Sequence, residues 1–561
     1  MRKMSVLSLV AALLSADAAT RPANLANLAG EDHLGRKIVS RAETGPVKPG
    51  RQVGLFYYLW MGQHGTQGPY DISKMEAADP DVMDKPDSPL WPDSTHTPML
   101  HWGEPLFGYY LSTDEWVIRR HVEMFIAAGI DVLYFDTTNG YHYREVTDRL
   151  FPILQEYHDS GFKVPKFCYY MAPNRRGSGT SNVLDVWLNY YKDRKFSDLY
   201  FMWDGKPLIV THPDRPYRQE ILDFFTFRRP TWCTPSKPDT WYWGGMPTQN
   251  VAVASNGRRE MLPVTVSTPH AAMESPTPQR GRGIGASEFR WRKDVQSRSW
   301  HHGRLDTRKN SSHYGFFLQE QMDWALAPER EDVPLAFVCQ WNEWLVPFLT
   351  EKSNDLYKMR HWIHLMDEYN MESSRDIEPM KGGFQDAYYL QLVNFVRRWK
   401  GLPDPAVAGK GDTVVFVEPT GDCAPRNHPG YDACGIYTNF TGRNEFADVC
   451  VSCDGTKLVF AANTVKPPLC DRETSMNLFL RVPGKEPDTL GYTHRYRRAA
   501  RYEIPLVDLG LDGTQRFELQ FKWSDNRQAD DPMDFYVNGD AAPRGRLNYL
   551  FVYDPQQGNR S

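Results

Sequence analysis

Residues 52–401 alternate between two patterns of apolar and polar positions. Short, continuously apolar runs are followed by longer segments in which apolar residues recur at helical spacing. The short runs predict strands at 53–60, 131–136, 163–173, 207–211, 261–268 and 334–341. The longer segments predict helices at 112–130, 143–160, 182–194, 217–224, 313–326 and 383–399. Apolar strands that alternate with helices indicate an α/β fold with a parallel sheet covered on both faces. About 350 residues of this pattern favour a (β/α)8 TIM barrel over an open sheet.

A different pattern begins after a linker at 402–412 that is rich in Pro and Gly. Turn residues separate short runs in which apolar and polar positions alternate with a period of two. These runs lie at 413–418, 457–463, 477–482, 516–523 and 549–554. They predict a β-sandwich over 413–561, which is either a carbohydrate-binding module or a structural partner of the barrel.

The first 19 residues have the layout of a secretory signal. Met-Arg-Lys-Met precedes the apolar stretch "SVLSLVAALL", and the small residues "SADAA" follow. We therefore expect a secreted protein, extracellular or periplasmic, in which residues 20–51 form an extension before the barrel. No later apolar run approaches the roughly 20 residues that a membrane helix requires. A formal net charge of -5 gives no argument for nucleic acid or a membrane surface as a partner.

Five of the eight cysteines crowd into a short part of the second region. They are Cys423, Cys434, Cys450, Cys453 and Cys470. In an exported protein this clustering predicts local disulfides, although the pairing cannot be read from the sequence. The stretch "CVSC" resembles half of a zinc site, but no second close pair or suitably spaced His accompanies it. We therefore expect no metal and no cofactor.

Polar residues collect where the predicted strands end. His64 follows the first strand, and Asp136 closes the second, with Asn139 and Tyr141 just beyond it. Further strand ends carry Tyr170, His270, Asn342 and Glu343, and Trp341 and Trp344 flank the last two. In a (β/α)8 barrel the active site lies at the carboxyl ends of the strands, so these side chains are candidates for catalysis and substrate binding.

Carboxylates among aromatic residues, without a metal motif, match glycoside cleavage. That reaction needs one acid to protonate the leaving oxygen and a second carboxylate that acts as nucleophile or base. The chain holds 17 Trp, 29 Tyr and 28 Phe, and flat rings suit the C–H faces of sugars. The tryptophans beside Glu343 could raise its pKa by desolvation. Whether the reaction retains or inverts the anomeric configuration depends on a distance in space and stays open.

Both predicted catalytic carboxylates have a structural alternative. Glu343 could be hydrogen-bonded to neighbouring backbone or to an Arg. Asp136 opens "DTTNG", which is also a good capping and turn sequence.

Several short motifs resemble the glycoside hydrolase family 71/99-like proteins, which include the endo-α-mannosidase family. They are "GLFYYLW" at 54–60, "HW" at 101–102, "AGIDVLYFDTTNG" at 128–140 and "WNEW" at 341–344. The resemblance implies a (β/α)8 barrel and cleavage of an α-linked glycan, and it adds Trp102 to the binding candidates. In the endo-α-mannosidase family, the Glu of Asn-Glu-Trp assists the reaction through the substrate's 2-hydroxyl, and a Glu three residues later serves as acid and base.

Glu343 matches the first of these two positions, but the second falls on Val346. Valine cannot transfer a proton, so the chain has another partner carboxylate, another mechanism or no activity. Asp136 is the preferred partner because it lies at a strand end, and Glu104 and Glu351 follow. The departure also makes α-mannan a poor expectation for the substrate.

The sequence therefore predicts an endo-acting glycoside hydrolase that acts on a polysaccharide or oligosaccharide. Arg clusters in the loops, such as "PNRRGSG" and "RWRKD", raise the hypothesis of a sulfated or uronic-acid glycan. Two other functions remain open: a noncatalytic glycan-binding protein on the same barrel, and a polysaccharide lyase with a Tyr or His base.

Overall fold

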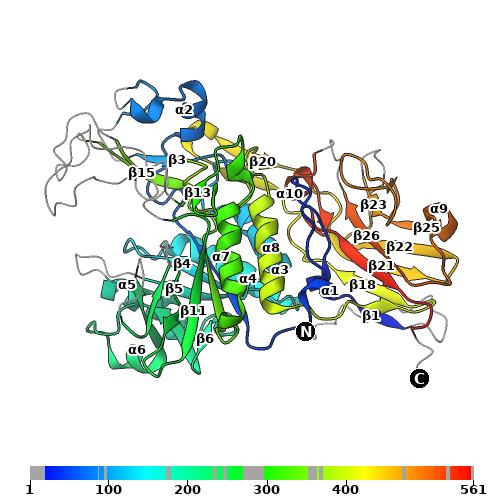
Figure 1. The fold of residues 1–561 in the computed structure, drawn as a ribbon, viewed down its shortest axis with the longest axis horizontal. Helices are drawn as coiled ribbons and strands as arrows, with labels where there is room; N and C mark the ends of the chain where they lie inside the picture. Colours follow the sequence, from blue (N-terminus) through cyan, green and yellow to red (C-terminus); the bar gives the residue numbers. More distant parts are fainter. Residues whose placement is uncertain are drawn as a thin grey trace.

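The computed structural model of the protein describes residues 19–85, 88–93, 98–171, 179–231, 237–243, 249–268, 296–350, 363–365, 370–470, 475–525 and 531–557. Figure 1 shows a sheet wrapped by helices on the left and two further sheets on the right. Helices α3 (Glu115–Ala128) and α8 (Ala387–Lys400) stand between these two parts.

A ten-stranded sheet forms the first part of the fold. Two of its strands, β6 (Met202–Trp203) and β10 (Ala252–Val253), pair antiparallel with their neighbours. The remaining eight run parallel in the order β11-β14-β2-β4-β5-β7-β8-β9. Their bounds are β2 (Gln52–Tyr57), β4 (Val132–Asp136), β5 (Lys166–Tyr170), β7 (Lys206–Val210), β8 (Thr226–Thr231), β9 (Thr240–Tyr242), β11 (Arg259–Thr265) and β14 (Leu335–Cys339).

The sheet is nearly closed into a barrel. Strand β10 pairs with β11, and the backbone N–H of Asp239, which precedes β9, donates to the carbonyl of Val253 at 3.0 Å. A buried ion pair crosses the same end, where Arg228 of β8 donates two hydrogen bonds to Glu260 of β11, both at 2.6 Å. Burial alone would raise the pKa of Glu260, but Arg228 and Arg258 lower it to about 2.

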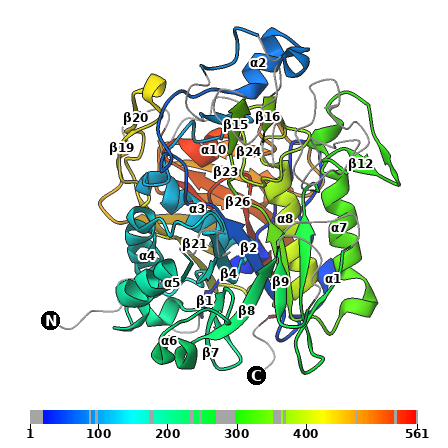
Figure 2. The ribbon, with the colours of Figure 1, turned by 90° about the vertical axis from the view of Figure 1, so that its left-hand side faces the viewer.

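The predicted parallel sheet and its six predicted strands are confirmed. Strands β8 and β9 were not predicted, because "TFRRPT" carries two Arg and "TWY" is only three residues long. Helices cover the outer face: α4 (Arg144–Asp159), α5 (Gly179–Val186) and α6 (Gln219–Phe224) lie on one side in Figure 2, and α7 (Phe316–Leu326) and α8 on the other.

Side chains alternate between the inside of this sheet and the helix layer. Phe56, Tyr134 and Phe337 pack together in the interior cluster, and their ring centroids lie 4.6 to 5.5 Å apart where they touch. Leu55 and Leu133, at intervening positions, belong to the cluster that packs against the helices. Because successive side chains on a strand point to opposite faces, Asp136 points inward like Tyr134.

A small cap lies over the carboxyl ends of the parallel strands (Figure 1, top). It consists of α2 (Ile72–Ala78) and a three-stranded sheet of β3 (Met99–His101), β15 (Leu345–Thr350) and β16 (Ile363–Leu365). Val346 lies on β15 opposite Leu100 of β3, and both are fully buried in an apolar cluster with Ile72. The position that carries the second Glu in the endo-α-mannosidase family therefore faces an apolar core in this chain.

Two sheets form the C-terminal part of the molecule. One has the order β1-β18-β21-β22-β25, and the other has the order β17-β28-β26-β23-β24, with β27 beside β26. Their bounds are β1 (Thr20–Pro22), β18 (Thr413–Val417), β21 (Phe446–Cys453), β22 (Lys457–Thr464), β25 (Arg501–Pro505), β17 (Val407–Ala408), β28 (Tyr549–Tyr553), β26 (Phe517–Ser524), β23 (Asn477–Arg481), β24 (His494–Tyr496) and β27 (Ala541–Ala542). Phe416 of the first sheet contacts Phe521 and Tyr549 of the second, with ring centroids 5.0 and 4.6 Å apart.

Short elements complete the described chain. They are the helices α1 (Arg41–Thr44), α9 (Leu506–Leu509) and α10 (Asp534–Val537), the strands β12 (Trp300–His301) and β13 (Arg304–Leu305), and the hairpin strands β19 (Arg426–Pro429) and β20 (Ile436–Asn439). No helix among the described residues is both long and apolar enough to span a bilayer.

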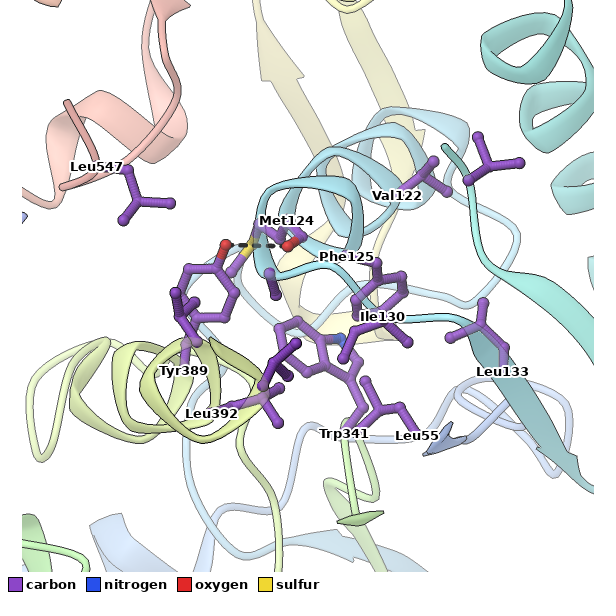
Figure 3. Packing of buried hydrophobic residues seen from close by; sticks show 14 of the residues in the cluster. Leu55, Val122, Met124, Phe125, Ile130, Leu133, Trp341, Tyr389, Leu392 and Leu547 are labelled. Carbon is purple, nitrogen blue, oxygen red and sulfur yellow. Dashed lines mark hydrogen bonds between the residues drawn. The ribbon is translucent and has the colours of Figure 1, made fainter. Parts of the chain in front are cut away.

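Aromatic and aliphatic side chains fill the space between α3, α8 and the parallel sheet (Figure 3). Trp341 packs edge to face against Phe125 of α3 at 4.8 Å, and Tyr389 of α8 lies 6.0 Å away. Tyr389 also donates a hydrogen bond to the carbonyl of Met124 at 3.0 Å. Replacing a buried ring such as Trp341 with Ala costs about 3 to 5 kcal/mol, so this layer holds the helices against the sheet.

The predicted disulfides are not found among the described cysteines. Strand geometry explains part of this result. Cys450 and Cys453 both lie on β21 and are three positions apart, and an odd separation along a strand points two side chains to opposite faces. Cys453 is accordingly buried, whereas Cys450 is partly exposed.

Candidate active site

Glu343 lies just beyond the carboxyl end of β14 and is 5% exposed. Its Oε2 accepts a hydrogen bond from Nη2 of Arg375 at 2.9 Å and another from the side-chain amide of Gln340. Arg375 and Gln340 are themselves buried. A guanidinium at this distance stabilises the ionised form of a carboxyl group, so the surroundings of Glu343 favour a carboxylate.

The backbone of Glu343 is fixed from both sides. Its N–H donates to Oδ1 of Asp376 at 2.5 Å, and its carbonyl accepts from Nε1 of Trp102 at 3.0 Å. The same indole N–H of Trp102 lies 2.9 Å from Oδ2 of Asp376. Trp102 stacks on Trp344 with ring centroids 4.3 Å apart, and both rings are fully buried. The stacked rings of Trp102 and Trp344 therefore support the loop that carries Glu343.

Asn342 joins the ends of β14 and β2. Its Oδ1 accepts the backbone N–H of Tyr58 at 2.8 Å, and its Nδ2 donates to the carbonyl of the same residue at 3.1 Å. The hydroxyl of Tyr58 in turn donates to Oε1 of Gln340 at 2.9 Å. With 1% of its surface exposed, Asn342 acts as a buried bridge between two strands.

A second buried carboxylate, Glu378, lies behind Trp344. It accepts hydrogen bonds from the hydroxyl of Tyr110 at 2.9 Å and from the indole N–H of Trp344. Its Oε1 lies 2.8 Å from Nε2 of His121 on α3. Both oxygens are thus engaged by side chains of the protein, and Glu378 is fully buried.

Asp136 occupies the carboxyl end of β4 and is 5% exposed. Its Oδ1 accepts the backbone N–H of Thr138 at 3.0 Å, which confirms the expected turn. Burial raises the pKa of Tyr143, a hydrogen bond from Asn139 lowers it, and the negative charge of Asp136 raises it further. Asn139, three residues after Asp136, donates to the hydroxyl of Tyr143, so the loop after β4 connects Asp136 to this ring.

Four rings gather next to Asp136, and we call them the aromatic platform: Trp60, His64, Tyr141 and Tyr143. Nε2 of His64 lies 2.8 Å from the hydroxyl of Tyr143, to which Asn139 also donates. The His64 ring meets Trp60 and Tyr141 edge to face, at 5.5 Å each. Tyr141 is 60% exposed, whereas Tyr143 is buried, so Tyr141 presents its ring to solvent. Burial lowers the pKa of His64.

Strand β2 separates the two catalytic candidates. Leu55 of β2 pairs with Val338 of β14 on one side and with Leu133 of β4 on the other. Neighbouring strands lie about 4.8 Å apart, so the backbones of β14 and β4 are about 10 Å apart. Inward-pointing side chains from these two strand ends converge over the interior of the sheet.

The structure brings together most of the predicted site residues. Asp136, His64, Asn139 and Tyr141 form one group, and Glu343, Asn342, Trp102 and Trp344 form the other. Tyr170 lies inside the sheet beside Asp136, fully buried, and its hydroxyl donates to the carbonyl of Trp241 at 2.7 Å.

Two predicted residues lie elsewhere. Trp341 points into the helix layer, as described above for Figure 3. Glu104 belongs to the cap, where it pairs with Lys74 at 2.8 Å and Lys381 at 3.0 Å. Burial raises the pKa of Glu104, but these two lysines bring it below its usual value. His270 lies outside the described residues, as does Glu351.

Sequence reasoning missed the segment that holds Glu343, namely Arg375, Asp376 and Glu378. In "SSRDIEPM" charged residues flank a single isoleucine, a pattern typical of an exposed loop. All three side chains are buried instead. The sequence carries no signal for this, because their partners, Glu343 and Trp102, lie far away in the chain.

Among the described residues, one group could offer three metal ligands: Asp422, Cys423 and Asp540. It lies in the C-terminal part, outside the candidate active site. Arg544 donates to Asp422 and lies 3.4 Å from Asp540. The guanidinium therefore already supplies positive charge to this group.

No protein-family model matches the chain, and no curated protein matches it. Among solved structures, two of the GH99 endo-α-mannosidase from Bacteroides thetaiotaomicron are similar to it. One, in complex with BIS-TRIS-propane, is 15% identical and covers 62% of this chain and 97% of its own, with a TM-score of 0.33. The other is 16% identical and covers 63% and 99%, also with a TM-score of 0.33. A likeness this distant carries no argument about activity.

Proposed function

We propose that the protein is a secreted glycoside hydrolase that cleaves internal bonds of a polysaccharide, with Glu343 and Asp136 as the catalytic pair. One observation carries the proposal. A buried carboxylate held by Arg375 and Gln340 stands at the end of β14, and the inward-pointing Asp136 stands across β2 beside the aromatic platform. Two carboxylates are what glycoside cleavage requires, and an exposed aromatic ring such as that of Tyr141 suits the face of a sugar.

The surroundings of the two carboxylates suggest different roles. Arg375 favours the ionised form of Glu343, which suits a nucleophile or a base that activates water. Asp136 would then be the acid that gives its proton to the glycosidic oxygen as the bond to the anomeric carbon breaks. The separation of the two side chains in the bound complex decides between retention and inversion.

The aromatic platform is the proposed binding surface for a sugar ring. Tyr141 exposes most of its ring, and His64 and Asn139 place polar groups beside it. Stacking on an aromatic face together with hydrogen bonds to hydroxyls is the usual combination in such sites. We further propose that the parallel sheet is a (β/α)8 barrel and that the two C-terminal sheets form a β-sandwich packed on it.

A panel of neutral and acidic polysaccharides tests the activity. Wild-type protein should release reducing ends from at least one polymer. Glu343→Gln and Asp136→Asn should each lower the rate at least about 100-fold, the size of a lost acid or base. Glu220→Gln, a carboxyl-to-amide change on the exposed face of α6, is the matched control and should behave like the wild type.

Full activity of Glu343→Gln would remove this residue from the mechanism. Binding of a polymer without any release of reducing ends would instead identify a noncatalytic glycan-binding protein. Val346 is buried at the position where the endo-α-mannosidase family has its acid and base, and this observation supports the noncatalytic alternative.

Polysaccharide lyase is the second candidate function. Its supporting observation is the hydrogen bond between His64 and Tyr143, because a Tyr or His base beside a uronic acid is what that reaction needs. A lyase would produce unsaturated, ultraviolet-absorbing ends, and His64→Ala would abolish them. The glycosidase proposal expects no increase in ultraviolet absorbance from any polymer that is cleaved.

An anionic substrate also remains a proposal. In the C-terminal part, Arg495 and Arg501 pair with Asp488 and Glu503. The Arg-rich stretches at 173–178 and 280–294 lie outside the described residues. Sulfated and desulfated forms of one polymer test the point, because equal rates on both would contradict an anionic requirement.

A further inference from the structure

A hairpin from the C-terminal part reaches the candidate active site. It comprises residues 426–439, and we call it the docking hairpin. Its strands β19 and β20 pair only with each other among the described residues. The hairpin leaves the C-terminal sheet between its neighbouring strands β18 and β21 and projects along the barrel (Figure 2, upper left, yellow).

The tip of the docking hairpin holds the loop that carries His64. The hydroxyl of Tyr431 accepts the backbone N–H of Gly62 at 3.0 Å. The N–H of Asp432 donates to the carbonyl of Thr66 at 2.8 Å, and that of Ala433 donates to the carbonyl of Gly68 at 2.9 Å. These three bonds lie on both sides of His64, whose own side chain is exposed to solvent. The position of His64 in the aromatic platform therefore depends on the hairpin.

The strands of the docking hairpin hold a second barrel segment, residues 107–114. Arg426 forms an ion pair with Asp114 at 2.8 Å and donates to the carbonyl of Phe107 at 2.9 Å. The hydroxyl of Tyr437 accepts the N–H of Tyr109 at 3.0 Å. A Cβ added at Gly108 would lie 2.7 Å from Tyr437, so the docking hairpin and this barrel segment are in close contact here.

This second segment leads directly to Glu343. Tyr110 lies in it, and its hydroxyl donates to Glu378 at 2.9 Å and accepts from Nδ2 of Asn342 at 3.3 Å. Asn342 precedes Glu343 in the chain. One hairpin thus fixes both groups of the candidate active site, the aromatic platform through Tyr431 and the Glu343 loop through Tyr110.

We propose that the docking hairpin is a positioning element of the active site and that Tyr431 is the positioning residue for the loop of His64. In this account the C-terminal part is required for substrate binding although none of its residues touches the reacting atoms. The contribution to substrate binding rests on the proposed function, whereas the control of the loop does not.

Tyr431→Phe tests the control of the loop. The variant keeps the ring that packs edge to face on His101 at 4.6 Å and removes only the acceptor for the N–H of Gly62. Hydrogen–deuterium exchange of peptides covering residues 61–70 should become at least about fivefold faster, the factor that corresponds to one lost hydrogen bond. The thermal midpoint should stay near the wild-type value. Ile436→Ala, at a 65% exposed position of the same hairpin, should change neither quantity.

Asp432→Pro is a second variant with the same expectation. Asp432 is the first residue of a short 3-10 helix, a position that tolerates Pro, so the change removes its N–H donor to Thr66 with little strain. It keeps the test decisive should Tyr431→Phe fail to fold. Unchanged exchange of residues 61–70 in a folded variant would overturn the proposal.

Kinetics on a polymer that the wild type cleaves supply the functional readout. Both variants should raise KM several-fold and change kcat less than twofold, because they displace the binding platform and leave Glu343 in place. Faster exchange with an unchanged KM would overturn the positioning role. If the wild type cleaves no polymer, the proposed function fails, and the exchange experiment still decides whether the hairpin controls the loop.

Discussion

Three side chains that lie close together determine the chemical state of Glu343. Arg375 and Gln340 both donate to the same carboxylate oxygen, and Asp376 accepts the N–H of the Glu343 backbone. A charge buried to this extent is tolerated only when it is paired and hydrogen-bonded. The pairing both permits the buried charge and fixes the direction in which the carboxylate points.

Removing Arg375 should therefore change the pH dependence of the reaction. In Arg375→Met the ionised form of Glu343 loses its stabilising cation, so the acidic limb of the pH–rate profile should move to higher pH and the maximal rate should fall. Initial rates across the pH range measure both effects. The matched control, Arg218→Met at an exposed position before α6, should leave the profile in place. An unshifted acidic limb in Arg375→Met would contradict the ionised role of Glu343.

His101 makes folding sensitive to acid. Its ring lies between Tyr109 and Tyr431, and neither ring nitrogen has a hydrogen-bond partner among the described residues. Burial lowers the pKa of His101 from 6.5 to about 3. Between these values the unfolded chain binds a proton that the folded chain does not, so stability is lost as the pH falls below 6.5.

His101→Phe should remove this sensitivity. A phenyl ring fits the same aromatic contacts and does not titrate. Between pH 6 and 4, the free energy of unfolding of the wild type should fall faster than that of the variant, by up to about 1.4 kcal/mol per pH unit. Denaturant unfolding at several pH values measures the two slopes. His302→Gln, at an exposed position, should retain the wild-type slope, and equal slopes in all three proteins would contradict the assignment.

At the scale of elements, the course of β15 accounts for an apolar residue, Val346, three residues after Glu343. The chain enters this strand at Leu345 and pairs with β3, which directs Val346 into the apolar cluster beneath α2. A glutamate at this position would be buried among Ile72, Met75 and Leu100.

Val346→Glu, which introduces the residue that the endo-α-mannosidase family has here, should therefore fail to raise the proposed activity. Burying an unpaired charge costs about 3 to 5 kcal/mol, so the thermal midpoint should fall sharply and the activity should not rise. Val346→Ile is the control for a change in size and should remain close to the wild type in both measurements. An active and stable Val346→Glu would show that this position faces the substrate after all.

The sequence predicts elements well where a local pattern carries them. The apolar runs at 131–136 and 334–341 became β4 and β14, so Asp136 closes a strand, as predicted, and Glu343 lies just beyond one. The sequence predicts the site less well where the residues that interact lie far apart in the chain. Arg375 and Asp376 meet Glu343 only in the folded chain, and Trp341, the last residue of the predicted strand, turns into the helix layer.

At the scale of the whole molecule, the N-terminal stretch ties the two parts together. Strand β1 pairs in parallel with β18 of the C-terminal part, and Ala29 exchanges backbone hydrogen bonds of 2.8 and 2.7 Å with Asn548. Farther along, Arg397 of α8 donates to the carbonyls of Leu28 and Val39 at 2.6 and 3.0 Å. Residues 20–39 therefore contact both parts.

We expect the molecule to unfold as one unit. A buried ion pair of 2.5 Å between Arg544 and Glu123 of α3 adds to the contacts between the two parts. Calorimetry should show a single transition for the wild type. Arg544→Met should lower its midpoint without splitting it, because Glu123 and Asp422 would lose their cation in a buried place. Two separate transitions in the wild type would contradict the coupling that the docking hairpin and β1 provide.

Cleavage in water enriched in heavy oxygen tests the central claim most directly. Hydrolysis at Glu343 and Asp136 transfers one oxygen atom from water to the anomeric carbon of each new reducing end. Mass spectrometry of the fragments should therefore show the heavy isotope at every new reducing end formed by the wild type and no new reducing ends from Glu343→Gln. New reducing ends that lack the heavy oxygen, or equal incorporation by Glu343→Gln, would contradict glycoside hydrolysis at this site.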